Sequence, residues 1–218
     1  MQHGDLSLKQ RVDQALAWEP SIDAAHIGVT AKDGVVTLAG FVHSYAEKVA
    51  AEQAARRVKG VQAIAQELEV RLPGNQQRAD DEIAARALDI LRWDTTVPDD
   101  AVTVKVEHGV VTLGGKVPWH YQRRRAQELV NRLSGVTNVV NLIQIRLAPE
   151  PHNLRHQIAE ALHRAAALDA ERISVEVEGG TVKLGGKVRS WAERITAEDV
   201  AWAAPGVQKV DDRITIAP

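Results

Sequence analysis

The chain has 218 residues, with 27 basic and 29 acidic side chains and a formal net charge of −2. A near-neutral chain with no strongly basic segment lacks the electrostatic signature of nucleic-acid-binding proteins, so we expect no nucleic-acid partner. The sequence contains no cysteine, which excludes disulfides and thiol chemistry.

The N-terminal residues do not predict export. A signal peptide has a basic region followed by an apolar core, and Met1-Gln2-His3-Gly4-Asp5 does not begin that pattern. No stretch of the sequence approaches the roughly 18 consecutive apolar residues of a membrane span. We therefore expect a cytoplasmic protein, with the periplasm as the alternative if an export signal lies outside this sequence.

The first predicted element is an amphipathic helix. Leu8, Val12 and Leu16 recur on one helical face, and residues 154–162 repeat the pattern behind Asn153, which we expect to cap that later helix. Alternating apolar residues on both sides of a two-residue turn follow, which is the signal of a β-hairpin.

A second helix and a last strand complete the unit. Ser44 and Glu47 have the spacing of a capping box, which Ser190 and Glu193 repeat. A last strand then alternates apolar and charged residues around Leu68. The helical crossover between the second and third strands makes them parallel.

The same unit occurs three times. The pattern G-x-V-x-L-x-G recurs at residues 34–40, 109–115 and 180–186, and a second glycine follows each copy twenty residues later. Self-similarity of this kind indicates a repeat architecture. We predict an α+β protein of three tandem αββαβ modules, spanning residues 1–72, 79–147 and 153–218. Each module is a three-stranded mixed sheet with two helices on one face.

We assign a structural role to the glycines that recur in all three modules, because hairpin turns and helix C-termini favour positive φ. They are Gly34, Gly40, Gly60, Gly109, Gly115, Gly135, Gly180, Gly186 and Gly206.

This arrangement of αββαβ units, with the G-x-V-x-L-x-G core and the later Gly-Val pairs at residues 60–61, 135–136 and 206–207, resembles the BON domain family. The family is found in bacterial osmotically inducible and nodulation-associated proteins. The resemblance implies a non-enzymatic module of envelope-stress proteins that is proposed to bind phospholipid surfaces. The resemblance implies no catalytic residues, and we expect no enzyme activity and no cofactor.

We also expect no metal site. His156, Glu160 and His163 share a helical face, but three polar residues on a solvated face more commonly bind no ion.

Two features are candidates for binding. Arg123, Arg124 and Arg125 open the second helix of module 2, where cations oppose the helix dipole, so an anionic partner is one interpretation. A solvated basic turn paired with nearby acids is the other. Trp119 lies just before them and is a candidate to enter a lipid interface with them.

The other feature is aromatic. Trp18 and Trp93 end the first helices at matching positions, and we expect them to close the cores. Ile195 and Trp202 lie on the outward side of their helix, and Phe41 lies on the least polar sheet face. Such residues form either a contact between modules or a patch for a partner, and we expect packing between modules.

Two functions remain open. The protein associates with anionic phospholipid surfaces, or it is a soluble stress protein whose apolar faces meet other proteins, as an interaction or chaperone-like module.

Overall fold

The computed structural model describes residues 2–146, 153–165 and 168–216. The ends of the predicted modules at residues 1, 147, 217 and 218 lie outside this range. Within it, no helix is both long enough and apolar enough to cross a membrane.

Each module begins with a long helix and an antiparallel hairpin. The first helices are α1 (Gln2–Ala17), α3 (Asp80–Trp93) and α5 (Leu154–Arg164). The hairpins are β1 (Ile27–Lys32) with β2 (Val35–Val42), β4 (Val102–Glu107) with β5 (Val110–Val117), and β8 (Ile173–Glu178) with β9 (Thr181–Val188). Short helical turns η1 (Ala24–His26) and η3 (Ala170–Arg172) precede β1 and β8, and η2 (Gly74–Gln76) lies between modules 1 and 2.

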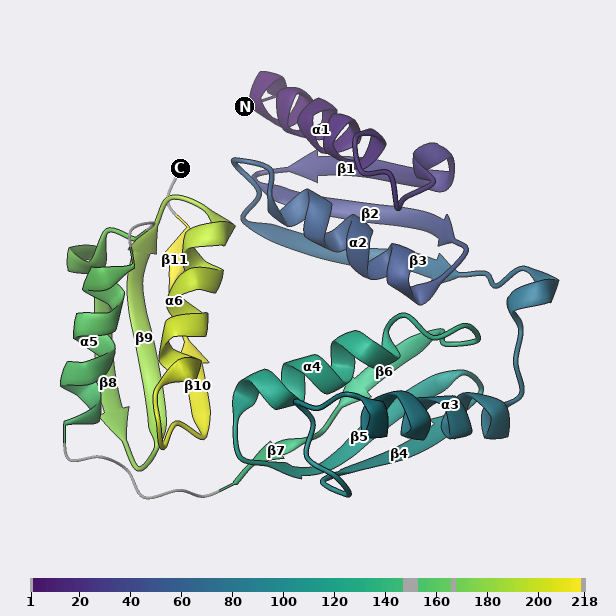
Figure 1. The fold of residues 1–218 in the computed structure, drawn as a ribbon. Coiled ribbons are helices and arrows are strands. Elements are labelled where there is room, and N and C mark those ends of the chain that lie inside the picture. Colours follow the sequence, from purple (N-terminus) through teal and green to yellow (C-terminus); the bar gives the residue numbers. More distant parts are fainter. Residues whose placement is uncertain (1, 147–152, 166–167, 217–218) are drawn as a thin grey trace.

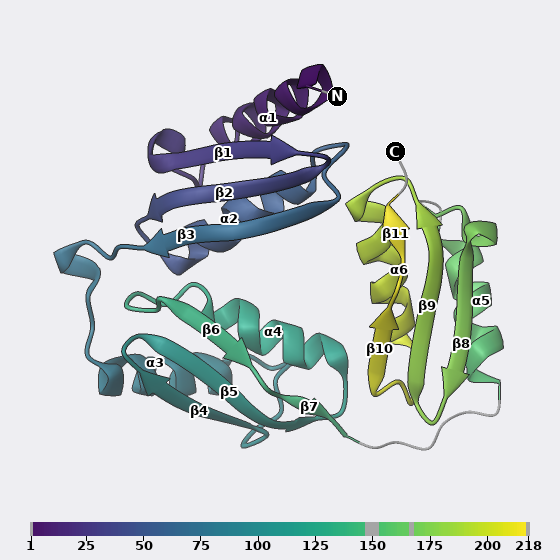
Figure 2. The same ribbon diagram turned by 180° about the vertical axis from the view of Figure 1, so that it is seen from behind.

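Each module ends with a second helix and a strand parallel to the central one. The second helices are α2 (Tyr45–Arg56), α4 (His120–Val130) and α6 (Trp191–Ala203). The last strands are β3 (Ala63–Val70), β6 (Asn138–Asn141) with β7 (Gln144–Ile145), and β10 (Lys209–Asp212) with β11 (Thr215–Ile216). The predicted fold, three αββαβ modules with mixed sheets, is confirmed (Figure 1). In Figure 2 the three sheets lie toward the viewer and α2, α4 and α6 lie behind them.

The last strand is continuous in module 1 and broken in the other two. At the break, the carboxamide of Asn141 accepts a hydrogen bond from the Ile143 N–H, and the carboxylate of Asp212 accepts one from the Ile214 N–H. Short Asn and Asp side chains form such turns with their own backbone. Module 1 has Gln66 at the equivalent position, one methylene longer, and its strand runs through without a break.

Each module has its own hydrophobic core between its helices and its sheet. In module 1, Val12 and Leu16 of α1 and Ala55 of α2 pack on Val36 and Leu38 of β2, and all are almost fully buried. The other two modules repeat this arrangement with their own residues. The periodic apolar residues of the sequence therefore account for the three cores.

Two sequence interpretations were wrong. Trp18 and Trp93 do not close the cores, because 88% and 86% of their surfaces are exposed. Each lies two residues beyond a buried leucine, Leu16 or Leu91, which turns it to the opposite side of the helix. Asn153 precedes α5 but makes no capping hydrogen bond; its side chain instead accepts one from the Gln157 side chain.

The recurring glycines all have positive φ. Gly60 and Gly135 lie in the turn that follows the helix rather than directly at its end, because α2 ends at Arg56 and α4 at Val130. The tightest position is Gly186, at which a Cβ would come 1.9 Å from the Arg172 carbonyl oxygen. At Gly40 a Cβ would come 2.1 Å from the His26 carbonyl oxygen.

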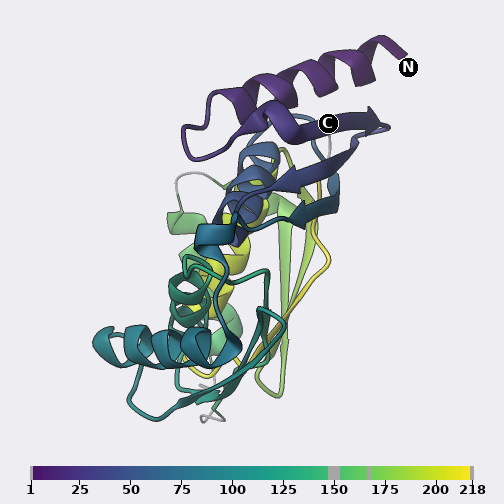
Figure 3. The same ribbon diagram turned by 90° about the vertical axis from the view of Figure 1, so that its right-hand side faces the viewer.

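The three modules are arranged so that their second helices approach one another. Figure 1 shows α2, α4 and α6 converging on the middle of the molecule, each from its own module. The side view in Figure 3 shows α1 at one end of the molecule and α3 at the other. The surface between the second helices is therefore shared by all three modules.

Candidate functional site

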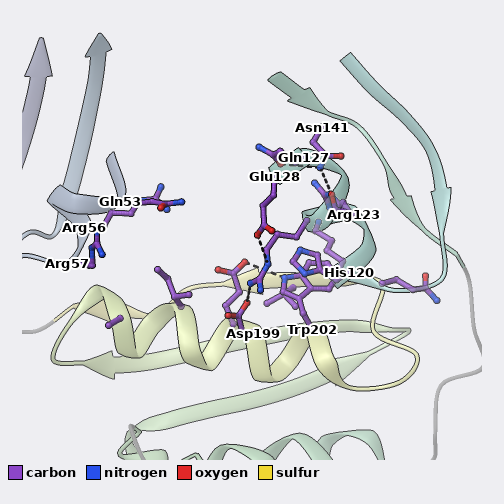
Figure 4. A pocket seen from close by; sticks show the side chains of 17 residues that line it. Gln53, Arg56, Arg57, His120, Arg123, Gln127, Glu128, Asn141, Asp199 and Trp202 are labelled. Atoms are coloured by element: carbon purple, nitrogen blue, oxygen red, sulfur yellow. Dashed lines mark hydrogen bonds and ion pairs between the residues drawn. The ribbon is translucent and has the colours of Figure 1, made fainter. Parts of the chain in front are cut away.

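A hollow lies where α2, α4 and α6 converge, and we name it the central cleft. It has a volume of about 880 Å³ (Figure 4). Its lining residues come from all three modules: Gln53, Arg56, Arg57, His120, Arg123, Arg124, Gln127, Glu128, Asn141, Ala192, Ile195, Glu198, Asp199, Trp202, Gln208, Lys209 and Val210.

Cationic side chains outnumber acidic ones in this lining. Five are Arg or Lys, from all three modules, and three are Glu or Asp. Arg56 pairs with Glu52, and Arg57 with Glu19 at 3.1 Å. Among the described residues, neither Arg123 nor Lys209 forms an ion pair. The cleft therefore has cationic groups that remain available to an anion.

The apolar wall of the cleft comes from module 3. Trp202 stacks on His120 of module 2, with ring centroids 4.1 Å apart and an interplanar angle of 9°. Ile195, seven residues before Trp202 on the same helix, is 38% exposed and also lines the cleft. The two residues predicted to face outward from α6 therefore lie in the cleft, beside cationic groups.

Burial lowers the pKa of His120 to about 4, and the charges of Arg123 and Arg124 act in the same direction. Asp199 opposes them only in part. The stacked imidazole is thus neutral at pH 7, and it adds no charge to the cleft.

The arginine run of module 2 is divided among different partners. Arg124 binds Asp199 of module 3 at 2.8 Å and Glu128 of its own helix at 3.5 Å. Arg125 points elsewhere and binds Asp94, at 2.7 Å. The pKa of Asp94 is lowered first by a hydrogen bond from the Thr96 hydroxyl and then by Arg125. Only Arg123 and Arg124 line the cleft.

Two other candidate residues lie apart from the cleft. Trp119 precedes α4, is 40% exposed and does not line the cleft. Phe41 lies on the sheet of module 1, where the Arg71 guanidinium sits 4.6 Å from its ring centroid and His26 lies against it at 4.4 Å. The sequence candidates therefore do not form a single site.

Module 1 reaches both other modules from α2. The Arg56 guanidinium lies 5.2 Å from the ring centroid of Trp191 in module 3. Tyr45 packs against the core of module 2, and burial raises the pKa of its phenol, although the Val139 backbone acts against the shift.

Sequence reasoning missed Arg56, Arg57, His120 and Lys209 as cleft residues. Each lies outside the core pattern of its own module, and only the packing of modules brings them together. It also missed Asp23, His26 and His43, whose metal-ligating atoms all lie within 4.8 Å of one another in module 1. In the helical group His156, Glu160 and His163, His156 lies 3.2 Å from Glu160.

The sequence of the chain is similar to known proteins. It is 32% identical over 145 residues to osmotically-inducible protein Y of Escherichia coli (strain K12), a match that spans 63% of this chain and 70% of that protein. Two solved structures of CdsD, a structural protein of the type III secretion system of Chlamydia trachomatis, share 13–14% identity over 97–98% of this chain, with a TM-score of 0.28. That score is too low to bear on the arrangement of the modules.

The sequence model of the BON domain matches residues 4–71, 79–146 and 152–218. These three matches cover nearly the whole chain and coincide with the three αββαβ units. The chain belongs to the BON domain family and carries three tandem copies of the domain.

Proposed function

We propose that the protein is a non-enzymatic, stress-related binding protein that associates with anionic phospholipid surfaces, with a headgroup phosphate held in the central cleft. The main support is the surplus of cationic side chains there, five against three acidic ones. Arginine and lysine bind phosphate oxygens through charge-assisted hydrogen bonds. The similarity to an osmotically inducible protein supports the stress-related part of the proposal.

The cleft suits an amphipathic anion better than a simple one. Arg123 and Lys209 supply charge and form no ion pair among the described residues, while Ile195 and Trp202 supply an apolar wall. A phospholipid offers a phosphate next to glycerol and acyl carbons, which matches this division. A free inorganic phosphate would use the charges alone.

Arg124 and Arg125 are poor probes of this proposal. Both form ion pairs with acids of the protein, so their replacement would disturb the fold or the packing of modules 2 and 3. The test is therefore the double variant Arg123→Gln/Lys209→Gln. The matched control is Arg92→Gln, which removes an exposed charge from the last turn of α3, outside the cleft.

The measurement is co-sedimentation with vesicles of phosphatidylglycerol and phosphatidylcholine, at low and physiological salt. The wild type should sediment with the anionic vesicles only, and less so at higher salt, because ionic strength screens exposed charges. A basic residue contributes roughly 1 kcal/mol at an anionic surface, so the double variant should partition about 30-fold more weakly. A double variant that partitions as the Arg92→Gln control does would contradict the role of the cleft.

A second function has its own observation. Trp18 and Trp93 occupy equivalent positions in modules 1 and 2 and are almost fully exposed. Exposed large aromatic side chains are typical of contacts with other proteins. A wild type that binds no vesicle but suppresses aggregation of an unfolding test protein, and loses this on Trp18→Ser/Trp93→Ser replacement, would favour the protein-interaction module.

A further inference from the structure

Three potential metal ligands lie together at one end of the module 1 sheet. The Asp23 carboxylate is 3.7 Å from the Nδ1 atom of His26. One ligand atom from each of Asp23, His26 and His43 lies within 4.8 Å of the other two. The rings of His26 and His43 have centroids 5.8 Å apart. None of these residues lines the central cleft.

The fold brings these residues together from two segments. His26 ends η1 directly before β1, and His43 follows β2 directly. Because β1 and β2 are antiparallel, with Ile27 opposite Gly40, the start of β1 lies beside the end of β2. The two histidines are therefore neighbours by the register of the hairpin.

A buried carboxylate fixes both segments. Glu47 of α2 accepts a hydrogen bond from the Asp23 N–H at 2.7 Å and another from the His43 N–H at 2.8 Å. The residue is only 8% exposed. Glu47 thus joins the backbone that carries Asp23 to the backbone that carries His43, so the ligand positions are held before any ion binds.

The histidine rings are also oriented. The Nδ1 atom of His43 lies 3.4 Å from the Arg71 carbonyl oxygen, and a histidine that donates one N–H to a backbone carbonyl presents its other nitrogen to a metal. The guanidinium of Arg71 itself is paired with Glu69 at 2.7 Å.

The other two modules offer an internal comparison. In module 3 the equivalent positions are Asp169, Arg172 and Arg189, and the aspartate accepts ion pairs from both arginines, at 3.1 and 3.4 Å. Module 2 has Pro98, Ala101 and Pro118 there, with no charge at all. In module 3 two permanent cations thus neutralise the aspartate. In module 1 two histidines stand in their place, which bind a metal cation when they are neutral.

We propose that module 1 binds a divalent transition-metal ion, of which Zn²⁺ is the representative, through Asp23, His26 and His43. Two imidazoles and one carboxylate suit zinc rather than calcium or magnesium, which prefer oxygen ligands. Zinc holds such ligands at about 2.0–2.2 Å, so that ligand atoms lie about 3.3 Å apart in a tetrahedron. Side-chain rotation by about 1 Å closes the observed spacing to that value, and the fourth position is open to water. The site is independent of lipid binding.

The test uses untagged full-length protein and zinc alone as the probe, with Co²⁺ as a spectroscopic substitute. Isothermal titration should find one site per chain, zinc should raise the unfolding temperature, and Co²⁺ should give visible absorption bands. The variant His26→Arg/His43→Arg copies the module 3 arrangement, so it should fold and lose at least about 100-fold in zinc affinity. The single variant Asp23→Asn gives a second readout, a loss of at least about 10-fold, if the double variant does not fold.

The matched control is His156→Ala/His163→Ala, which removes two histidines from α5 and should bind zinc as the wild type does. Wild-type protein that shows no zinc-dependent change at about a hundredfold molar excess of metal would overturn the proposal. Equal zinc binding by the wild type and by both site variants would place the ion elsewhere and overturn it as well.

Discussion

At the scale of single residues, one position repeated through the modules shows how a side chain joins two segments. Glu47, Gln122 and Glu193 occupy the third position of their second helices, and each accepts a backbone N–H from the segment before the helix. Within the described parts of the chain, Glu47 alone accepts a second backbone N–H, that of Asp23. The capping box was thus half right: Ser44 accepts from the Glu47 N–H, but the glutamate reaches past the serine to the residue before it.

Gly40 is the most constrained of the recurring glycines in module 1. Its φ is +120°, and a Cβ there would lie 2.1 Å from the His26 carbonyl oxygen, so one backbone must move. We expect Gly40→Ala to lower the free energy of unfolding of module 1 by about 3 kcal/mol. Urea unfolding followed by circular dichroism measures this.

The control for that prediction is Gly28→Ala on the neighbouring strand. Its Cβ would lie 3.6 Å from the nearest atom, the Ala39 carbonyl oxygen, which is an ordinary contact. The change should stay within about 0.5 kcal/mol. Equal losses for the two variants would show that the close approach at Gly40 is not what makes the position sensitive.

At the scale of elements, α4 shows that a charged run in the sequence cannot be interpreted without knowing which side chains it contacts in the fold. Three consecutive arginines near a helix start seem unfavourable when only the helix dipole is considered. The structure gives Arg124 an acid in module 3 and gives Arg125 the side chain of Asp94, which is 10% exposed. Both partners are distant in sequence, so local reasoning could not find them.

We therefore expect Arg125→Gln to destabilise module 2, by about 1 kcal/mol, although the dipole alone predicts a gain. Removing the guanidinium leaves the shielded Asp94 carboxylate with Thr96 alone as a hydrogen-bond partner. Thermal unfolding of Arg125→Gln beside Arg123→Gln measures the effect, since Arg123 has no ion pair among the described residues. A more stable Arg125→Gln variant would mean that the dipole outweighs the pair with Asp94.

The helices and strands also show which structural features the sequence predicts and which it does not. The αββαβ order was readable because Leu8, Val12 and Leu16 recur with a helical period and the hairpin turns carry glycine. The break in the last strand escaped notice, although Asn141 and Asp212 were visible as turn-forming residues where module 1 has Gln66. The match between Trp18 and Trp93 reflects the helix side that both occupy, opposite the buried Leu16 and Leu91, and does not indicate burial.

At the scale of the whole molecule, the arrangement of modules is the part that sequence reasoning could not supply. Repetition determines what each module is, but the contacts between modules use residues that differ among the copies. Trp202 aligns with Asn131 and Arg56 and has no aromatic counterpart, and it stacks on His120 of module 2. Tyr45, His120 and Trp191 all begin a second helix, but the three rings have different partners, since Trp191 meets Arg56 and Tyr45 packs on the core of module 2. The contacts around the central cleft therefore combine a ring position that repeats in every module with residues, such as Trp202, that do not repeat.

The contact between modules 2 and 3 should weaken in mild acid because of His120. Its pKa is about 4 in the folded protein and 6.5 in an unfolded chain, so between these values the unfolded state binds a proton that the folded state does not. The contribution of the neutral His120 to the free energy of unfolding is greatest near pH 7. It falls as the pH is lowered through 6.5 and changes no further below about pH 4. Attraction between a charged imidazole and the Trp202 ring, and solvent screening at the partly exposed ring, reduce the loss to about 1 kcal/mol.

Chemical unfolding at pH 7 and pH 5 of the wild type, His120→Gln and His156→Gln measures this effect. The acids titrate in all three proteins, so the informative quantity is the difference in the loss of stability between them. The wild type and His156→Gln should lose about 1 kcal/mol more than His120→Gln on acidification, because only the last lacks the shielded imidazole. Equal losses in all three proteins would mean that the His120–Trp202 stack does not make the packing of modules 2 and 3 sensitive to pH.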